Sequence, residues 1–271
     1  MDSALDWHGA KALLEWYIEL GAVDAVGDLP VDRYALAPTP PKSDLKPGAR
    51  PGARTAARTP APPPPEPVAR DFAAETVALA ETATSLEALA GTMRDFDGLE
   101  IRKGARNFVF ADGNPRARVM IVGEAPGADE DRIGRPFVGR AGQLLDRMFA
   151  AIGLARDHPY ADNAFYITNI LPWRPPANRT PTADEMRIMV PFVRRHIALV
   201  DPDVLILMGN TPCNALLGRS GILRMRGHWT EAEGRPVMPM THPAYLLRNP
   251  AAKREAWADL LEVRAKLREG A

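Results

Sequence analysis

The sequence predicts an α/β protein with three layers, α/β/α, around a mostly parallel central sheet of about four strands. Short apolar runs alternate along the chain with longer segments whose apolar residues recur at helical spacing. The runs are apolar throughout rather than alternating, which is typical of strands buried on both faces. A content of 46% hydrophobic and 25% charged residues is ordinary for a chain that buries a core.

The strands and helices are expected in alternation from about residue 70 onward. The expected strands span residues 117–122, 165–171, 203–209 and 236–241. The expected helices span residues 71–93, 143–152, 182–200, 211–217 and 250–268. Thr182 and Glu185 form a capping box at the start of the third helix, and Asn249 followed by Pro250 suits the N-cap and first position of the last.

The first 69 residues differ in composition from the rest of the chain. Residues 1–35 carry apolar residues near helical spacing, which predicts a helical appendage. Residues 36–69 are rich in Pro, Ala and Arg without apolar periodicity, which predicts an extended linker, either a solvated spacer or a basic segment that touches phosphates. The main domain is then expected over residues 70–271.

Charge and cysteine content exclude several classes of protein. Thirty-four basic and 34 acidic residues cancel, which excludes a histone-like protein but leaves room for a local basic surface. The single cysteine, Cys213, excludes a disulfide framework, a cysteine zinc finger and a four-cysteine iron–sulfur site. Because no apolar stretch reaches membrane-spanning length and no secretory signal is visible, we expect a cytoplasmic protein without membrane association. We also expect the protein to act as a monomer.

Polar and aromatic residues follow three of the expected strands, at the edge where open α/β sheets bind ligands. The first strand ends in a glycine-rich acidic loop over residues 123–142, the second ends at Asn169, and His242 follows the fourth. The loop lacks the GK[ST] ending of a phosphate-binding loop, and its carboxylates Glu124 and Asp131 would repel a triphosphate. A nucleotide-phosphate enzyme is therefore the weakest alternative.

The side chains at this edge suit a flat base. Phe137 lies between glycines of the loop, where its ring can stack on a planar ligand or simply anchor the loop. The carboxamide of Asn169 offers an acceptor and donors that match N3–H and O4 of uracil, while cytosine presents the opposite pattern. Taken alone, Asn169 can also cap the following turn, and His242 can be a structural histidine.

Three segments resemble the signature blocks of the family 4 uracil-DNA glycosylases. They are GEAPGADEDRIGRPFVGRAGQLLDRM, YITNILPWRPPANRTPT and THPAYLLR, and the resemblance covers roughly residues 85–265. It implies that residues 70–271 hold a catalytic domain that flips deoxyuridine out of DNA and hydrolyses its N-glycosidic bond. Uracil-containing DNA, single- or double-stranded, would be the partner and free uracil a product.

The resemblance also implies roles for individual residues. The backbone of Gly123, Glu124 and Ala125 would line the uracil pocket, Phe137 would stack on the base and Asn169 would read it. His242 would donate to O2 as negative charge develops there, and Glu124 and Asp131 are unranked candidates to orient the water. Leu246 or Leu247 would fill the gap left by the base. The residues expected to meet phosphates are Arg140, Arg174, Arg179 and Arg248.

One feature departs from the family. Its four iron–sulfur ligand positions fall here at about Phe96, Leu99, Trp173 and Met189, none of which supplies a thiolate. We therefore expect no cofactor and no metal, and a small apolar cluster in place of the iron–sulfur group. The other alternative from a different class is a non-catalytic uracil or damage sensor that uses the same pocket.

Overall fold

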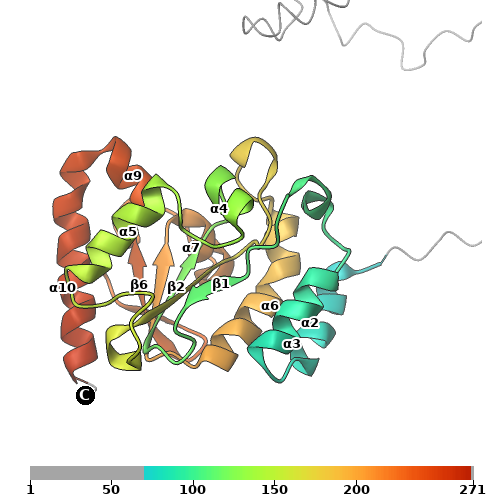
Figure 1. The fold of residues 1–271 in the computed structure, drawn as a ribbon, viewed down its shortest axis with the longest axis horizontal. Helices are drawn as coiled ribbons and strands as arrows, with labels where there is room; N and C mark the ends of the chain where they lie inside the picture. Colours follow the sequence, from blue (N-terminus) through green and yellow to red (C-terminus); the bar gives the residue numbers. More distant parts are fainter. Residues whose placement is uncertain (1–69, 270–271) are drawn as a thin grey trace, which may run out of the picture. The chain divides into compact units, whose positions relative to one another are not determined.

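The computed structural model describes residues 70–269, which form one sheet with helices on both faces (Figure 1). The strands are β1 (Ala111–Gly113), β2 (Val119–Gly123), β3 (Phe165–Asn169), β4 (Val204–Met208), β5 (Thr230–Ala232) and β6 (Arg235–Met240). The predicted helical appendage (1–35) and linker (36–69) lie outside the described residues. Among those residues, no helix is both long and apolar enough to span a membrane.

The sheet has six strands in the order β1-β3-β2-β4-β6-β5 rather than the expected four. The inner pairs β3–β2, β2–β4 and β4–β6 are parallel, as predicted. The two additional strands are β1 and β5, short edge strands that pair antiparallel with β3 and β6. The sheet is therefore mixed, and its parallel centre consists of the four predicted strands.

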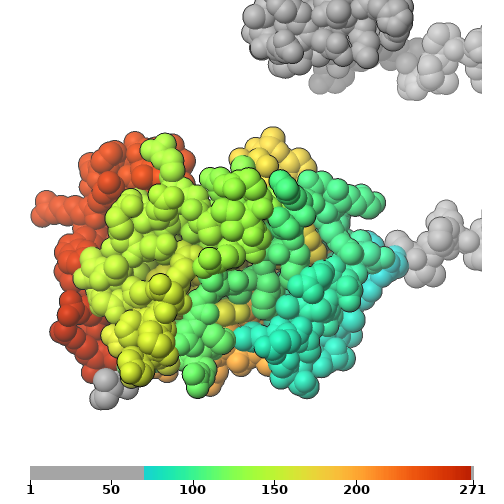
Figure 2. All heavy atoms as spheres, viewed as in Figure 1, coloured from blue at the N-terminus to red at the C-terminus, as the bar shows by residue number. Residues whose placement is uncertain are grey.

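The helices occupy two groups on opposite sides of the sheet (Figure 1). Their bounds are α2 (Phe72–Thr82), α3 (Leu86–Asp95), α4 (Ala128–Ile133), α5 (Arg140–Ala150), α6 (Ala183–Val200), α7 (Asn210–Leu217), α8 (Ile222–Met225), α9 (Pro243–Arg248) and α10 (Lys253–Glu269). Single 3-10 turns span Glu100–Gly104, Ala161–Asn163, Pro176–Asn178 and Pro250–Ala252. In the same view drawn as spheres, α10 (red) lies at one end of this face and α2 and α3 (cyan) lie at the other (Figure 2).

Two large clusters of buried side chains form most of the core, one on each face of the sheet, because successive residues of a strand face opposite sides. Met120 and Val122 of β2 face the cluster formed with α3 and α6, and Val119 and Ile121 face the cluster formed with α5 and α10. All five residues of β2, β3 and β4 are buried. The continuous apolar runs in the sequence thus correspond to strands covered on both faces.

The helix expected over residues 71–93 is two helices, which corrects that expectation. α2 ends at Thr82, and Ser85 caps α3 by accepting from the N–H of Ala88 at 3.1 Å. The break lets the two helices pack separately on α6, whose capping box at Thr182 and Glu185 is present as predicted. The expected helix over 143–152 begins earlier, at Arg140, and the last helix begins with the 3-10 turn at Pro250.

Candidate active site

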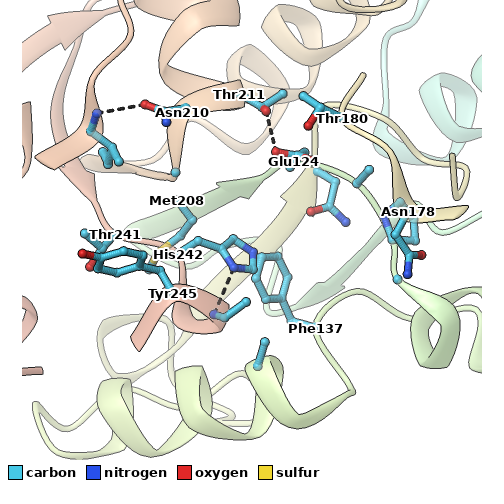
Figure 3. A pocket seen from close by; sticks show the side chains of 18 of the residues that line it. Glu124, Phe137, Asn178, Thr180, Met208, Asn210, Thr211, Thr241, His242 and Tyr245 are labelled. Atoms are coloured by element: carbon cyan, nitrogen blue, oxygen red, sulfur yellow. Dashed lines mark hydrogen bonds between the residues drawn. The ribbon is translucent and has the colours of Figure 1, made fainter. Parts of the chain in front are cut away.

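A cavity of about 830 Å³ opens at the carboxyl ends of the parallel strands. Its lining includes five of the six residues expected to bind uracil, Glu124, Ala125, Phe137, Asn169 and His242, which lie at or after the ends of three different strands. Figure 3 shows the rings of Phe137 and His242 beside each other in this cavity, and their centroids are 5.5 Å apart. The topology therefore brings together the aromatic face, the carboxamide and the imidazole.

Gly123 does not line the cavity, but it makes the meeting of two other residues possible. Gly123 and Asn169 are paired at the last positions of β2 and β3. A Cβ atom at Gly123 would lie 2.4 Å from Oδ1 of Asn169 and 2.5 Å from Cζ of Phe137. Only glycine leaves room for both side chains there.

Two buried polar atoms at this site have no hydrogen-bond partner among the described residues. They are Oδ1 of Asn169 and Oγ1 of Thr241, and both residues line the cavity. Asn169 is only 4% exposed and Thr241 1%. Because a buried polar atom without a partner is costly, we expect both atoms to gain a partner when water or a polar ligand fills the cavity.

His242 presents a neutral imidazole to the cavity. Burial, with a smaller contribution from the charge of Arg248, lowers the pKa of His242 to about 4, against an opposing effect of Glu130. Its Nδ1 accepts the backbone N–H of Ala244 at 3.2 Å, shown as a dashed line in Figure 3. Since Nδ1 must carry a lone pair to accept, the ring proton lies on Nε2, which makes Nε2–H a donor.

The two candidate carboxylates occupy different places. Glu124 lines the cavity, and its Oε2 accepts from the hydroxyl of Thr211 at 2.5 Å (Figure 3). Asp131 is buried, does not line the cavity, and accepts the backbone N–H groups of Arg106 and Asn107 at 2.8 and 3.0 Å. The geometry thus separates two carboxylates that the sequence left unranked, and Asp131 holds the segment before β1.

The residues expected to contact DNA are not all at the rim. Arg179 and Arg248 line the cavity, and Arg179 pairs with Glu185 at 2.6 Å. Arg140 is exposed at the first position of α5, and Arg174 donates to Oδ1 of Asn178 at 2.7 Å.

The two leucines expected to fill the gap left by the base differ in burial. Leu246 is fully buried against Leu144 and Ala256, whereas Leu247 is half-buried on α9.

The residues at the four iron–sulfur positions do not suit such a group. Phe96, Leu99, Trp173 and Met189 are all buried in the same core cluster, with exposed fractions of 4% or less. The ring of Phe96 packs edge-on against Phe192 with centroids 5.7 Å apart. Carbon side chains, with one thioether, fill this region, and Cys213 is the only cysteine in the sequence.

Sequence reasoning missed several residues that shape the site. Thr211 and Asn210 follow β4, and both line the cavity. Glu130 also lines it and accepts from Gly127, Val138 and Gly139, joining two loops. The signal for Glu130 was its place three residues after Gly127, which is the N-cap of α4, a helix that the sequence analysis treated as loop.

Comparison with known proteins gives a consistent family. Residues 110–261 match the family described as the uracil DNA glycosylase superfamily, a stretch of more than half of the chain. A type-4 uracil-DNA glycosylase from Thermotoga maritima is 39% identical over 146 residues, which cover 53% of this chain and 73% of that protein. The type-4 enzyme of Archaeoglobus fulgidus is 36% identical over 173 residues, covering 60% of this chain and 84% of the relative.

A more distant relative is a type-5 uracil-DNA glycosylase from Pyrobaculum aerophilum, which is 32% identical over 146 residues, covering 49% of this chain and 64% of that protein. The family match covers β2, β3, β4 and β6, whose ends form the cavity. The chain belongs to the uracil DNA glycosylase superfamily.

Proposed function

We propose that this chain hydrolyses the N-glycosidic bond of deoxyuridine in DNA, releasing uracil and leaving an abasic site, as a step of base excision repair. The observation that carries the proposal is the unpartnered Oδ1 of Asn169 in a cavity shared with Phe137 and a neutral His242. A flat ligand with an N–H donor at one edge and a carbonyl at another suits these three groups together. Uracil is such a ligand.

Recognition in this proposal rests on hydrogen-bond polarity. Oδ1 of Asn169 accepts N3–H of uracil, and the amide nitrogen donates to O4. Cytosine has an acceptor at N3 and a donor at C4, so both contacts become unfavourable. Because the carboxamide is buried, a wrong base leaves unpaired groups out of water, which is a strong basis for discrimination. Phe137 supports the base by stacking on its face.

Bond cleavage in this proposal is driven by stabilising the leaving base. As the C1′–N1 bond breaks, its electrons pass to the uracil, and negative charge gathers on O2. The Nε2–H of His242 donates to that oxygen, and a preorganised donor in a buried site is worth more than in water. Glu124, held by Thr211, accepts a hydrogen bond from the water that adds to C1′ and favours the positive charge of the sugar. The proton that this water loses is matched by the proton that the uracil anion takes up, so the products are uracil and an abasic site.

Contacts with DNA outside the cavity are assigned to the rim. Arg248 and Arg179 meet phosphates, and Arg140 and Arg174 lie on neighbouring segments that the duplex or single strand would cross. Leu247 is the better candidate to occupy the space of the flipped base, because Leu246 would first have to leave the core. Localisation in the cytoplasm and action as a monomer remain expectations.

The proposal is tested by incubating the purified full chain with oligonucleotides that carry one uracil, as a single strand and opposite G or A, with EDTA present. Alkali cleavage of the products reveals abasic sites, and strands with cytosine or thymine at the same position are the controls. We expect cleavage at uracil only. Tight binding to uracil-containing DNA without any abasic site would refute the proposed glycosylase activity and would support the alternative, a non-catalytic uracil sensor.

A further inference from the structure

Two side chains from other parts of the chain, Arg156 and Glu130, form hydrogen bonds with the backbone of the segment that carries Phe137. Nη1 of Arg156 donates to the carbonyl of Pro136 and Nη2 to the carbonyl of Phe137, both at 3.0 Å. Oε1 of Glu130 accepts the N–H groups of Val138 and Gly139, both at 2.8 Å. Backbone groups of four consecutive residues are thus satisfied by two ionised side chains.

This support matters because Phe137 has a backbone that a bulky residue avoids. Its φ is +54°, in the left-handed region. Such a conformation persists only where the surroundings impose it. Gly142 also packs closely against this backbone, since a Cβ atom at Gly142 would lie 1.7 Å from the carbonyl oxygen of Phe137.

The guanidinium of Arg156 is itself fixed. Nη1 donates to Oδ2 of Asp112 at 2.8 Å, and Nε and Nη2 donate to Oδ1 of Asp146 at 3.0 and 2.7 Å. With the two carbonyl bonds, these contacts use all five N–H donors of the side chain. The side chain is only 10% exposed. Asp112 also pairs with Arg135 at 2.8 Å.

The charges of this group are mutually stabilised. Burial alone would raise the pKa of Asp112, but hydrogen bonds and charges from Arg156 and Arg135 outweigh it and hold that pKa below its ordinary value. The carboxylate therefore stays ionised at neutral pH and keeps the guanidinium in place.

We propose that Arg156 is a positioning residue for base recognition, which holds the ring of Phe137 at the angle required to stack on the flipped base. Arg156 does not line the cavity, so it acts through the two carbonyl groups and not by touching the ligand. The inference rests on the proposed function, because it assigns to Phe137 the face on which uracil stacks. Nothing in the sequence pattern around Arg156 indicates this role, since it lies in the turn after α5 and reaches the loop only in space.

Lysine cannot take over this role. Its ammonium is a single point with three donors, whereas Arg156 spans two carbonyl groups and two carboxylates in one plane. Arg156→Lys therefore keeps the charge and the ion pairs but releases at least one carbonyl. The ring of Phe137 then samples other orientations, and misplacement by about 1 Å costs on the order of 10²-fold in rate.

The chain offers a matched control in Arg102. Its Nη1 donates to the carbonyls of Asp95 and Phe96 at 3.1 and 3.0 Å, so it also holds two consecutive carbonyl groups. Those carbonyls lie at the end of α3, and none of the three residues lines the cavity. Arg102→Lys therefore makes the same chemical change without touching the Phe137 segment.

The experiment compares wild type, Arg156→Lys and Arg102→Lys in three measurements: the single-turnover rate of uracil excision at saturating enzyme, the Kd for a duplex without uracil, and amide hydrogen exchange at Val138 and Gly139. We expect Arg156→Lys to lower the rate about 10- to 100-fold, leave the Kd within about twofold, and speed exchange at both amides. Arg102→Lys should match wild type in all three.

The outcomes separate the inference from the proposed function. A wild-type rate in Arg156→Lys, or an equal loss in Arg102→Lys, overturns the positioning role while leaving the glycosylase intact. If Arg156→Lys does not fold, Asp112→Asn removes one of its anchors and is expected to lower the rate in the same direction, and an unchanged rate overturns the inference. If the wild type forms no abasic site, the proposed function fails. Unchanged amide exchange in Arg156→Lys would then also overturn the proposal that Arg156 holds the Phe137 segment in place.

Discussion

The backbone N–H of Ala244 donates to Nδ1 of His242 at 3.2 Å, which leaves the only proton of the neutral ring on Nε2. This tautomer is the one that places a donor toward a ligand. Ala244 is the second residue of α9, so the helix start itself fixes the proton. Sequence alone gave the position of His242 after a strand but not its protonation.

The first prediction concerns this proton. Burial lowers the pKa of His242 to about 4, so the ring should stay neutral from pH 8 down to about pH 5. Two-dimensional ¹H–¹⁵N spectra of the imidazole report both tautomer and protonation. We expect an Nε2–H tautomer and a titration midpoint near 4. A midpoint near 6.5, or a proton on Nδ1, would contradict the assignment.

The second prediction tests base reading. Asn169→Asp keeps an acceptor for N3–H but replaces the amide donor with a second oxygen, which repels O4 of uracil. Excision of uracil should fall by about 10²-fold or more, since two hydrogen-bond acceptors, the new carboxylate oxygen and O4 of uracil, then face each other in a buried site. Asn163→Asp is a suitable control because Asn163 is exposed at the turn before β3. Equal excision rates for the wild type and Asn169→Asp would remove Asn169 from base recognition.

The third prediction compares two helical glycines. A Cβ at Gly142 would collide with the carbonyl of Phe137, whereas a Cβ at Gly91 in α3 meets nothing within 4 Å. Gly142→Ala should lower the free energy of unfolding by about 1–3 kcal/mol and reduce excision. Gly91→Ala should raise that free energy by about 0.5–1 kcal/mol and leave excision unchanged. Urea unfolding and single-turnover rates decide, and similar behaviour of both variants would contradict the contact.

The fourth prediction concerns stability and pH. Burial lowers the pKa of His196 to about 3 and is the main cause of the lowered pKa of His242. As pH falls below about 6.5, the unfolded chain binds protons at both histidines while the folded chain does not. Stability is therefore greatest above this pH, and the free energy of unfolding should fall by up to about 1.4 kcal/mol per pH unit for each histidine.

Urea unfolding at pH 7, 6 and 5 measures this slope. His242→Asn should lower the slope by the share of one histidine. A free energy of unfolding that rises as pH falls from 7 to 5 would contradict the lowered pKa values of His196 and His242.

The fifth prediction concerns the apolar cluster formed by Phe96, Leu99, Trp173 and Met189. Phe96 also contacts Phe72, with ring centroids 6.1 Å apart. Phe96→Ala should lower the free energy of unfolding by about 3–5 kcal/mol because it leaves a cavity. Val77→Ala, at a position 46% exposed on α2, should change it by less than about 0.5 kcal/mol. The free energy of unfolding of both variants is measured by chemical denaturation. Equal losses in the two variants would show that packing of Phe96 in the core does not stabilise the fold.

The parallel centre of the sheet was predictable because its strands are continuous apolar runs. β1 and β5 were not, since each is a three-residue edge strand that has no buried residue and no apolar pattern. The break between α2 and α3 had a signal in Ser85, an N-cap residue inside the segment that was predicted as one helix.

For the site, strand ends were sufficient to locate Asn169, Phe137 and His242 at one cavity. The same reasoning does not reach Arg156 or Thr211, whose partners are distant in sequence: Thr211 bonds Glu124 87 positions away. Nor does it separate Glu124 from Asp131, because a helix, α4, turns the second carboxylate toward the segment before β1. Such relations depend on packing between elements, which periodicity and spacing do not encode.

The cluster around Phe96 joins the end of α3, the turn after β3 and the middle of α6 through carbon contacts. Apolar contacts of this kind stabilise a fold less as the temperature falls, and chelators do not affect them. We therefore expect low temperature to loosen the contacts among these three segments more than a chelator does.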